Sequence, residues 1–198
     1  MSDLARRSRP LTMDTMGLKP GIPLQASQGG VEELRQDIQR LMDMEAIRQL
    51  KHAYFRCIDT ANFEEFATLI HPEVDVLLKG GNYEWKLNGR DAYVEAVTRS
   101  FHNQSIGHHN GHHPEIQMLS DREATAIWYL ADHMWMTEAE FYTSGTALYW
   151  DRYLKEDGRW LIRETCYERI YEFNEKQDVR PKLHVHYLAG NGSPASAE

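Results

Sequence analysis

The second half of the chain contains four strand-like runs that follow one another with only turn-sized gaps. These runs are rich in aromatic and β-branched side chains and cover residues 115–119, 123–136, 140–154 and 160–174. The gaps between them are polar and short, namely Ser120-Asp121, Thr137-Glu138 and Glu156-Asp157-Gly158. Because strands joined by such turns pair antiparallel, this half predicts an antiparallel meander.

The first half is predicted to be mainly helical. Apolar residues recur at helical spacing over residues 31–58, and Asp43 is expected to cap a second helical run inside this stretch. Asn62 followed by Glu65 is typical of a helix start, so a short helix is expected there. A further helical pattern covers residues 90–101.

A hairpin is expected between the second and third helical segments. Residues 74–78 and 83–87 alternate around the pair Gly80-Gly81, which gives the order α-α-β-β-α-β-β-β-β. A long twisted sheet curls, and amphipathic helices are available to cover its concave side. We therefore predict an α+β fold, in which a cone-shaped curved antiparallel sheet wraps around N-terminal helices and encloses a cavity.

The chain is expected to form one domain between two tails. Its 198 residues are 41% hydrophobic, which suits a single domain with a core of its own. Residues 1–30 contain several Pro and Gly without periodicity, so we expect an extended or disordered arm. The domain is expected over residues 31–175, and a C-terminal tail over residues 176–198.

Composition narrows the classes of partner. A formal net charge of -8 disfavours nucleic acid and anionic membranes as partners. Cys57 and Cys166 form no metal or disulfide motif and no apolar run reaches membrane-spanning length, so a soluble protein of the reducing cytoplasm is expected. Because an open curved sheet leaves apolar surface, we also expect a homo-oligomer, either a dimer or a trimer.

Asp132 is out of place in its predicted strand. Its face of the run 123–136 is otherwise apolar and comprises Ala124, Ala126, Trp128, Leu130, Met134 and Met136. A carboxylate there must be paired or have a raised pKa, and both conditions are common at functional sites. The structural alternative is that Asp132 reaches solvent at a strand end, because the opposite face is also apolar.

Four of the ten histidines lie in the segment His108-His109-Asn110-Gly111-His112-His113. Because imidazole titrates near neutral pH, one of them is expected to transfer protons, and at least two to be surface loop residues. A metal site that includes Asp132 and Glu115 is an alternative. The spacing matches no zinc template, so no metal is expected.

Tyr54 and Asp59 lie five residues apart on the long helical segment. At about 100° per residue they point about 140° apart around the helix axis, so they face one cavity only if the helix end lies across its mouth. The structural alternatives are a core tyrosine and an aspartate that caps the following turn.

Several short motifs together resemble the SnoaL-like family of the nuclear-transport-factor-like, or cystatin-like, superfamily. The resemblance covers about residues 35–172 and is carried by Asp43-Met44-Glu45-Ala46-Ile47 with Tyr54, Asp59 and Phe63, by Gly89-Arg90-Asp91-Ala92, by His109 with His112-His113-Pro114-Glu115-Ile116, and by Asp157-Gly158-Arg159-Trp160.

The site pattern is most similar to the branch of bile-acid 7α-dehydratase and scytalone dehydratase. This resemblance implies catalytic roles for Tyr54, Asp59, His109 and Asp132, with His112 as the second choice of histidine. A limonene-epoxide-hydrolase-like Asp-Arg-Asp site matches less well, and it stays open through Arg56, Arg152 and Arg163.

We therefore expect a cofactor-free lyase (dehydratase) or isomerase that acts by acid–base catalysis on a hydrophobic, ring-containing hydroxylated small molecule. His109 is expected to be the base, with Asp59 or Asp132 orienting it. Tyr54 is expected to donate a hydrogen bond to the oxygen that gains charge. The expected substrate wall comprises His112, Trp128, Leu130, Met134 and Tyr149.

Two noncatalytic alternatives share the expected fold. One is a ligand-binding module, which needs the cavity without converging catalytic groups. The other is a structural subunit similar to the small subunit of ring-hydroxylating dioxygenases, which needs an apolar outer sheet face such as Tyr142, Leu148 and Trp150 could supply.

Overall fold

The computed structural model describes residues 10–25, 29–139, 141–179 and 182–195. The first elements are α1 (Val31–Asp59), α2 (Phe63–Leu69), β1 (Ile70–Lys79), β2 (Glu84–Asn88) and α3 (Arg90–Ser100). They are followed by β3 (Ser105–Met118), β4 (Glu123–Met136), β5 (Phe141–Glu156), β6 (Arg159–Lys176) and α4 (Tyr187–Asn191). The predicted order of helices and strands is confirmed, and α4 is an addition in the C-terminal segment.

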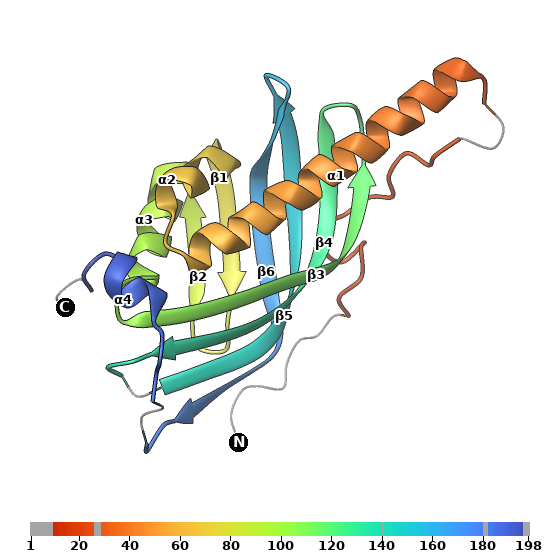
Figure 1. The fold of residues 1–198 in the computed structure, drawn as a ribbon. Coiled ribbons are helices and arrows are strands. Elements are labelled where there is room, and N and C mark those ends of the chain that lie inside the picture. Colours follow the sequence, from red (N-terminus) through yellow and green to blue (C-terminus); the bar gives the residue numbers. More distant parts are fainter. Residues whose placement is uncertain (1–9, 26–28, 140, 180–181, 196–198) are drawn as a thin grey trace.

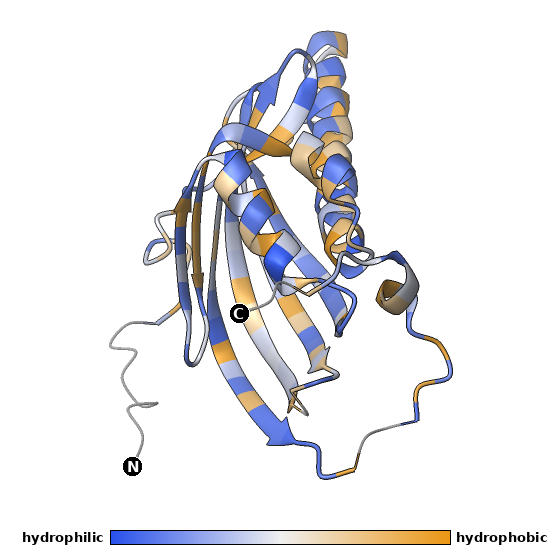
Figure 2. Ribbon diagram, turned by 90° about the vertical axis from the view of Figure 1, so that its left-hand side faces the viewer, coloured by the Kyte–Doolittle hydropathy of each residue, from blue (hydrophilic) through white to orange (hydrophobic). Residues whose placement is uncertain are grey.

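The strands form one six-stranded sheet in the order β2-β1-β6-β5-β4-β3 (Figure 1). Each described pair of neighbours is antiparallel except β1 and β6, which are parallel. The sheet is curved, and helices α1, α2 and α3 lie on its concave side (Figure 2). The predicted α+β fold is thereby confirmed, with one parallel pair that the hairpin pattern did not indicate.

Helix α1 is continuous, which corrects the expected cap at Asp43. That residue lies in the middle of the 29-residue helix, where no Gly or Pro interrupts the chain. Its carboxylate accepts hydrogen bonds from Lys155 Nζ (2.6 Å) and Trp160 Nε1 (2.9 Å). Burial raises the pKa of Asp43, but these donors outweigh burial and lower it below its usual value.

No helix in the described ranges is long and apolar enough to cross a membrane.

Strand β3 starts ten residues earlier than predicted, at Ser105. The histidine segment is therefore part of the sheet and not a surface loop, because β4 offers pairing partners as far as Met136. A bulge between His112 and Glu115, with His113 at φ 48°, interrupts the ladder. The prediction depended on alternation of apolar and polar residues, and the polar His and Asn side chains in this segment show no such alternation.

Residues 11–18 lie against the convex side of the sheet. Leu11, Met13, Met16 and Leu18 pack with Ile127, Leu148 and Trp150 in a second apolar cluster. Farther along, the backbone N–H of Ile22 donates to the carbonyl of Met118 (2.8 Å). Part of the outer apolar face is thus covered by this chain itself. The division into arm, domain and tail stays a prediction, and residues 1–9 lie outside the described ranges.

Gly111 allows α1 to approach β3 closely. A Cβ atom added at Gly111 would stand 1.9 Å from the Phe55 ring, which stacks on His109 at 6.1 Å between ring centroids. We expect Gly111→Ala to lower the free energy of unfolding by about 1–3 kcal/mol, because the ring must leave its rotamer. Urea denaturation measures this loss. Gly190→Ala, whose added Cβ meets nothing within 4 Å, is the neutral control.

Candidate active site

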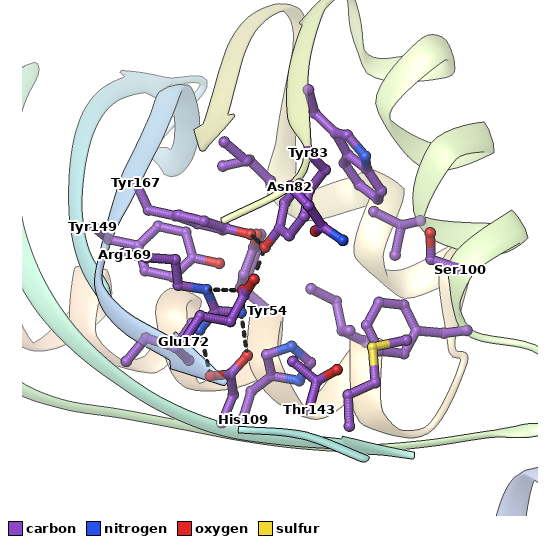
Figure 3. Close-up of a pocket in the computed structure, with 18 of the residues that line it drawn as sticks. Tyr54, Asn82, Tyr83, Ser100, His109, Thr143, Tyr149, Tyr167, Arg169 and Glu172 are labelled. Atoms are coloured by element: carbon purple, nitrogen blue, oxygen red, sulfur yellow. Dashed lines mark hydrogen bonds and ion pairs between the residues drawn. The ribbon is translucent and has the colours of Figure 1, made fainter. Parts of the chain in front are cut away.

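A cavity of about 340 Å³ lies between the concave face of the sheet and the helices (Figure 3). This volume is at the small end of the range for ligand sites, which is about 300–1,000 Å³. Its apolar lining includes Ile58, Leu78, Trp85, Val97, Phe101, Leu130 and Met134. Its polar lining includes Tyr54, Tyr83, His109, Asp132, Thr143, Tyr149, Arg169 and Glu172. The apolar wall and clustered polar groups suit a small hydrophobic molecule that carries oxygen.

His109, in the wall of this cavity, forms a short acid–base pair with Asp59. Nδ1 of His109 lies 2.5 Å from Oδ1 of Asp59, and the His109 backbone N–H donates to Oδ2 (2.9 Å). Phe101 packs edge-on against the imidazole, which is 11% exposed. A Nδ1–H that donates to the carboxylate leaves the unprotonated Nε2 as the basic nitrogen. This is the arrangement in which a carboxylate orients a general base.

The end of α1 connects both Tyr54 and Asp59 to the cavity, but only Tyr54 lines it, whereas Asp59 lies behind His109. Tyr54 points into its interior and shares a hydrogen bond with the Tyr93 hydroxyl (2.5 Å), whereas Asp59, the last helical residue, reaches His109 on β3. Burial, and then the neighbouring tyrosines, raise the pKa of Tyr54 well above its usual value. Tyr54 is therefore a neutral phenol that can donate a hydrogen bond.

Asp132 does not orient His109, although the two residues are cross-strand partners. Its carboxylate pairs with Arg169, with Oδ1 2.5 Å from one terminal guanidinium nitrogen and Oδ2 2.7 Å from the other. Such a two-point pair satisfies both carboxylate oxygens. The expectation that a carboxylate on this apolar face must be paired agrees with this geometry, and of the two aspartates offered as orienting groups the structure places Asp59 beside the imidazole.

The sequence reasoning missed the polar side chains that β6 and the β1–β2 hairpin contribute to the pocket, among them Tyr83, Tyr167, Arg169 and Glu172. Arg169 and Glu172 form an ion pair (2.8 Å), and Tyr167 shares a short hydroxyl contact with Tyr83 of the β1–β2 hairpin. A register shift in the pairing of β5 with β6 at Thr146/Ala147 places two β6 residues opposite one, so that Arg169 and Glu172, three apart, both point inward. A strict period of two puts them on opposite faces, so the sequence carried no signal for this pair.

Two residues of the expected substrate wall lie away from the cavity. His112 is on the outer face of β3, where it stacks on Tyr129 at 5.6 Å, and burial followed by the neighbouring His113 lowers its pKa. Trp128 is fully buried in the core, does not line the cavity, and donates from Nε1 to the Tyr153 hydroxyl (3.0 Å). Leu130, Met134 and Tyr149 do line the cavity.

A buried ion pair lies beneath the tyrosines. Lys51 Nζ is 2.8 Å from Asp151 Oδ2, and neither side chain has any exposed surface. Asp151 also accepts hydrogen bonds from Tyr153 (2.7 Å) and Thr165 (2.8 Å). The ammonium group stands 3.8 Å from the centroid of the Tyr149 ring. Burial lowers the pKa of Lys51, and Asp151 opposes that shift.

Comparison with known proteins assigns the chain to a family. The family model for the SnoaL-like domain matches residues 39–165. A hexachlorocyclohexane dehydrochlorinase, LinA type 2, is similar in fold, with a TM-score of 0.64, 15% identity, and coverage of 75% of this chain and 98% of that one. A candidate scytalone dehydratase from Novosphingobium aromaticivorans has a TM-score of 0.58 and 21% identity, and the match covers 81% of this chain and 98% of that one. The chain belongs to the SnoaL-like domain family.

Proposed function

We propose that this protein is a cofactor-free lyase or isomerase, in which His109 is the general base for a hydrophobic, ring-containing hydroxylated small molecule. The observation that carries the proposal is the 2.5 Å contact between His109 Nδ1 and Asp59 Oδ1 at the wall of an apolar cavity. A histidine whose second nitrogen is held by a carboxylate is a common proton-transfer device.

The proposed step is the removal of a proton next to a carbonyl or a similar acidifying group. Nε2 of His109 takes the proton, and the electron pair of the broken C–H bond forms a carbon–carbon double bond. In a dehydration the neighbouring C–O bond breaks, and the imidazolium returns its proton to the leaving hydroxyl, which departs as water. In an isomerisation the proton returns to another carbon.

The tyrosines are proposed to stabilise the oxygen that gains charge in this step. Tyr54 and Tyr149 are neutral because burial, as the largest cause, raises the pKa of both phenols well above the usual value. A donor in a site with little water stabilises a developing oxyanion more strongly than it would in bulk solution. Asp132, held by Arg169, is proposed to shape the polar side of the cavity.

The fold comparisons support this class of reaction without naming the substrate. The two similar structures bear the names of a dehydrochlorinase and a dehydratase, and both names describe eliminations. The family also includes noncatalytic binding proteins, for which the cavity alone would be enough. The short His109–Asp59 contact favours catalysis over a binding-only role, because binding an apolar ligand needs no oriented base.

A second candidate is hydrolysis at an arginine flanked by two acids, as in the limonene-epoxide-hydrolase-like alternative. None of the three arginines named in that alternative lines the cavity. Arg56 pairs with Glu65, Arg152 pairs with Glu123 and Glu164, and Arg163 pairs with Asp75. Arg169, however, lies between Asp132 and Glu172 inside it. Hydrolysis of a cyclic epoxide that is lost in Asp132→Asn and kept in His109→Ala would favour this candidate.

The proposed function is tested by proton exchange and loss of water. Cyclic β-hydroxy ketones are incubated with the protein in D₂O, where NMR follows exchange of the α-hydrogen and ultraviolet absorbance follows formation of the conjugated enone. The wild-type protein is expected to catalyse one of these changes in at least one compound. If compounds bind but neither change exceeds that of a His109→Ala sample, the binding-only alternative becomes the better account.

We expect Asp59→Asn to lower turnover by ~10²-fold or more. Both oxygens of Asp59 accept hydrogen bonds from His109, one from the backbone N–H and one from Nδ1. An asparagine has a single oxygen, so its NH2 group must face one of the two His109 nitrogens. It either opposes the backbone N–H, or it faces Nδ1 and forces the imidazole proton onto Nε2. The pH profile of turnover measures this change. An unchanged rate with an unchanged profile would remove Asp59 from the mechanism.

A further inference from the structure

The cavity contains more acids than permanent cations. Of the described residues that line it, Asp132 and Glu172 are the carboxylates and Arg169 is the one guanidinium or ammonium group. Asp59 adds a further carboxylate directly behind His109. With a neutral imidazole the site therefore has a negative net charge. A negatively charged ligand is attracted to it only if Arg169 is free to pair with that ligand.

Arg169 is already occupied by protein groups. Its two terminal nitrogens donate to the oxygens of Asp132, and one of them also lies 3.4 Å from the Tyr83 hydroxyl. Its Nε stands 2.8 Å from Glu172 Oε2 in an ion pair that is not aligned as a hydrogen bond. A ligand carboxylate that sought this guanidinium would have to compete with two carboxylates of the chain.

Glu172 is held in place from two sides. Its Oε1 accepts a hydrogen bond from the backbone N–H of Gly81 (3.1 Å), and its side chain is 6% exposed. Between Asp132 and Glu172 in the cross-strand row stands Gly145, where a Cβ atom would come within 3.3 Å of the Arg169 guanidinium. The missing side chain at Gly145 leaves room for the guanidinium between the two acids, and Figure 3 shows Arg169 beside Glu172 at the cavity.

We propose that Glu172 is a specificity-determining residue that makes the cavity selective for uncharged ligands over anionic ones. The inference rests on the proposed function, because it assigns the charge class of that same site's substrate. An anion entering this cavity meets like charge on side chains that are almost wholly buried, where repulsion is screened weakly. An uncharged hydroxylated or keto compound avoids this repulsion and can accept hydrogen bonds from the tyrosines. The substrate class is therefore neutral ring compounds, and carboxylates and phosphate esters are excluded.

The test compares two ligands of the same shape and different charge, 2-naphthamide and 2-naphthoate, by isothermal titration calorimetry at neutral pH. The wild-type protein is expected to bind the amide ~10-fold or more tightly than the acid. Glu172→Gln keeps an oxygen that can accept from Gly81 and removes one negative charge. We expect it to raise the affinity for naphthoate ~10-fold and to change the affinity for naphthamide less than ~3-fold.

Glu175→Gln is the matched control, because it removes the same charge from an exposed position on the same strand. It is expected to leave both affinities unchanged. Equal binding of amide and acid by the wild-type protein, or an unaltered preference in Glu172→Gln, overturns the inference and leaves the proposed catalysis standing. Failure of both ligands to bind would overturn the inference together with the proposed function, since the cavity would then accept no apolar ring compound.

Discussion

His109→Ala is expected to lower turnover by ~10²–10⁴-fold, the usual contribution of one positioned acid or base. The imidazole is held by Asp59 at 2.5 Å and lines the cavity, so no solvent molecule can replace it with the same orientation. Stability is expected to change less than activity, because the side chain is not wholly buried. The rate of enone formation or α-hydrogen exchange measures the first effect, and urea denaturation measures the second.

His108→Ala is the matched control for this experiment. His108 is the preceding residue of β3, and its ring stacks on His133 outside the cavity, at 6.0 Å between centroids. Its removal is expected to leave turnover within ~2-fold of wild type, by the same reasoning. A His109→Ala protein that is as active as His108→Ala would refute the proposed base. Because His109 and Asp59 act as one unit, the double variant with Asp59→Asn is expected to cost about as much as His109→Ala alone.

The parts of the fold that alternate strictly were predictable from the sequence. The run 123–136 is β4 with the same bounds, and its period of two placed Leu130, Asp132 and Met134 on one face. All three line the cavity. Asn62 caps α2 as expected, because its side chain accepts from the backbone N–H of Glu65. Local chemistry and a regular period were sufficient in these places.

The histidine was harder to choose because the start of β3 was missed. Pairing of the whole strand with β4 puts His109 opposite Asp132, so alternation turns His109 inward and His108 outward. That choice depends on the ladder formed with the following strand, β4, and not on any local preference of a His-rich segment for β structure. The prediction reached His109 only through family resemblance.

The contacts that decide the roles of the acidic residues join positions even farther apart in the sequence. Asp59 and His109 are 50 residues apart, and Asp132 and Arg169 are 37 apart. Arg169 and Glu172 share the cavity only because an irregularity in the β5–β6 pairing shifts the period of β6. No pattern in a single sequence records which residue an irregularity will turn inward, so the partner of Asp132 could not be found.

Asp151→Asn is expected to be the most destabilising single change in the core, with a loss of about 3–5 kcal/mol in the free energy of unfolding. Tyr153 and Thr165 donate to different oxygens of Asp151, so the single asparagine oxygen can accept from only one of them, and the ammonium of Lys51 loses its only counterion among the described contacts. Contact with the Tyr149 ring compensates for only part of that loss. Urea denaturation at neutral pH measures the change.

The double variant Lys51→Met/Asp151→Asn separates the charge of Lys51 from other effects of the substitution. It is expected to be more stable than Asp151→Asn at neutral pH, because no charge then remains buried without a partner. Burial lowers the pKa of Lys51, so above its folded pKa and below its unfolded value the unfolded chain binds more protons than the native protein. The stability of Asp151→Asn should therefore rise with pH in that window, by at most about 1.4 kcal/mol per pH unit, and approach that of the double variant. A constant difference between the two variants across this range would mean that Lys51 does not carry a charge that Asp151 neutralises.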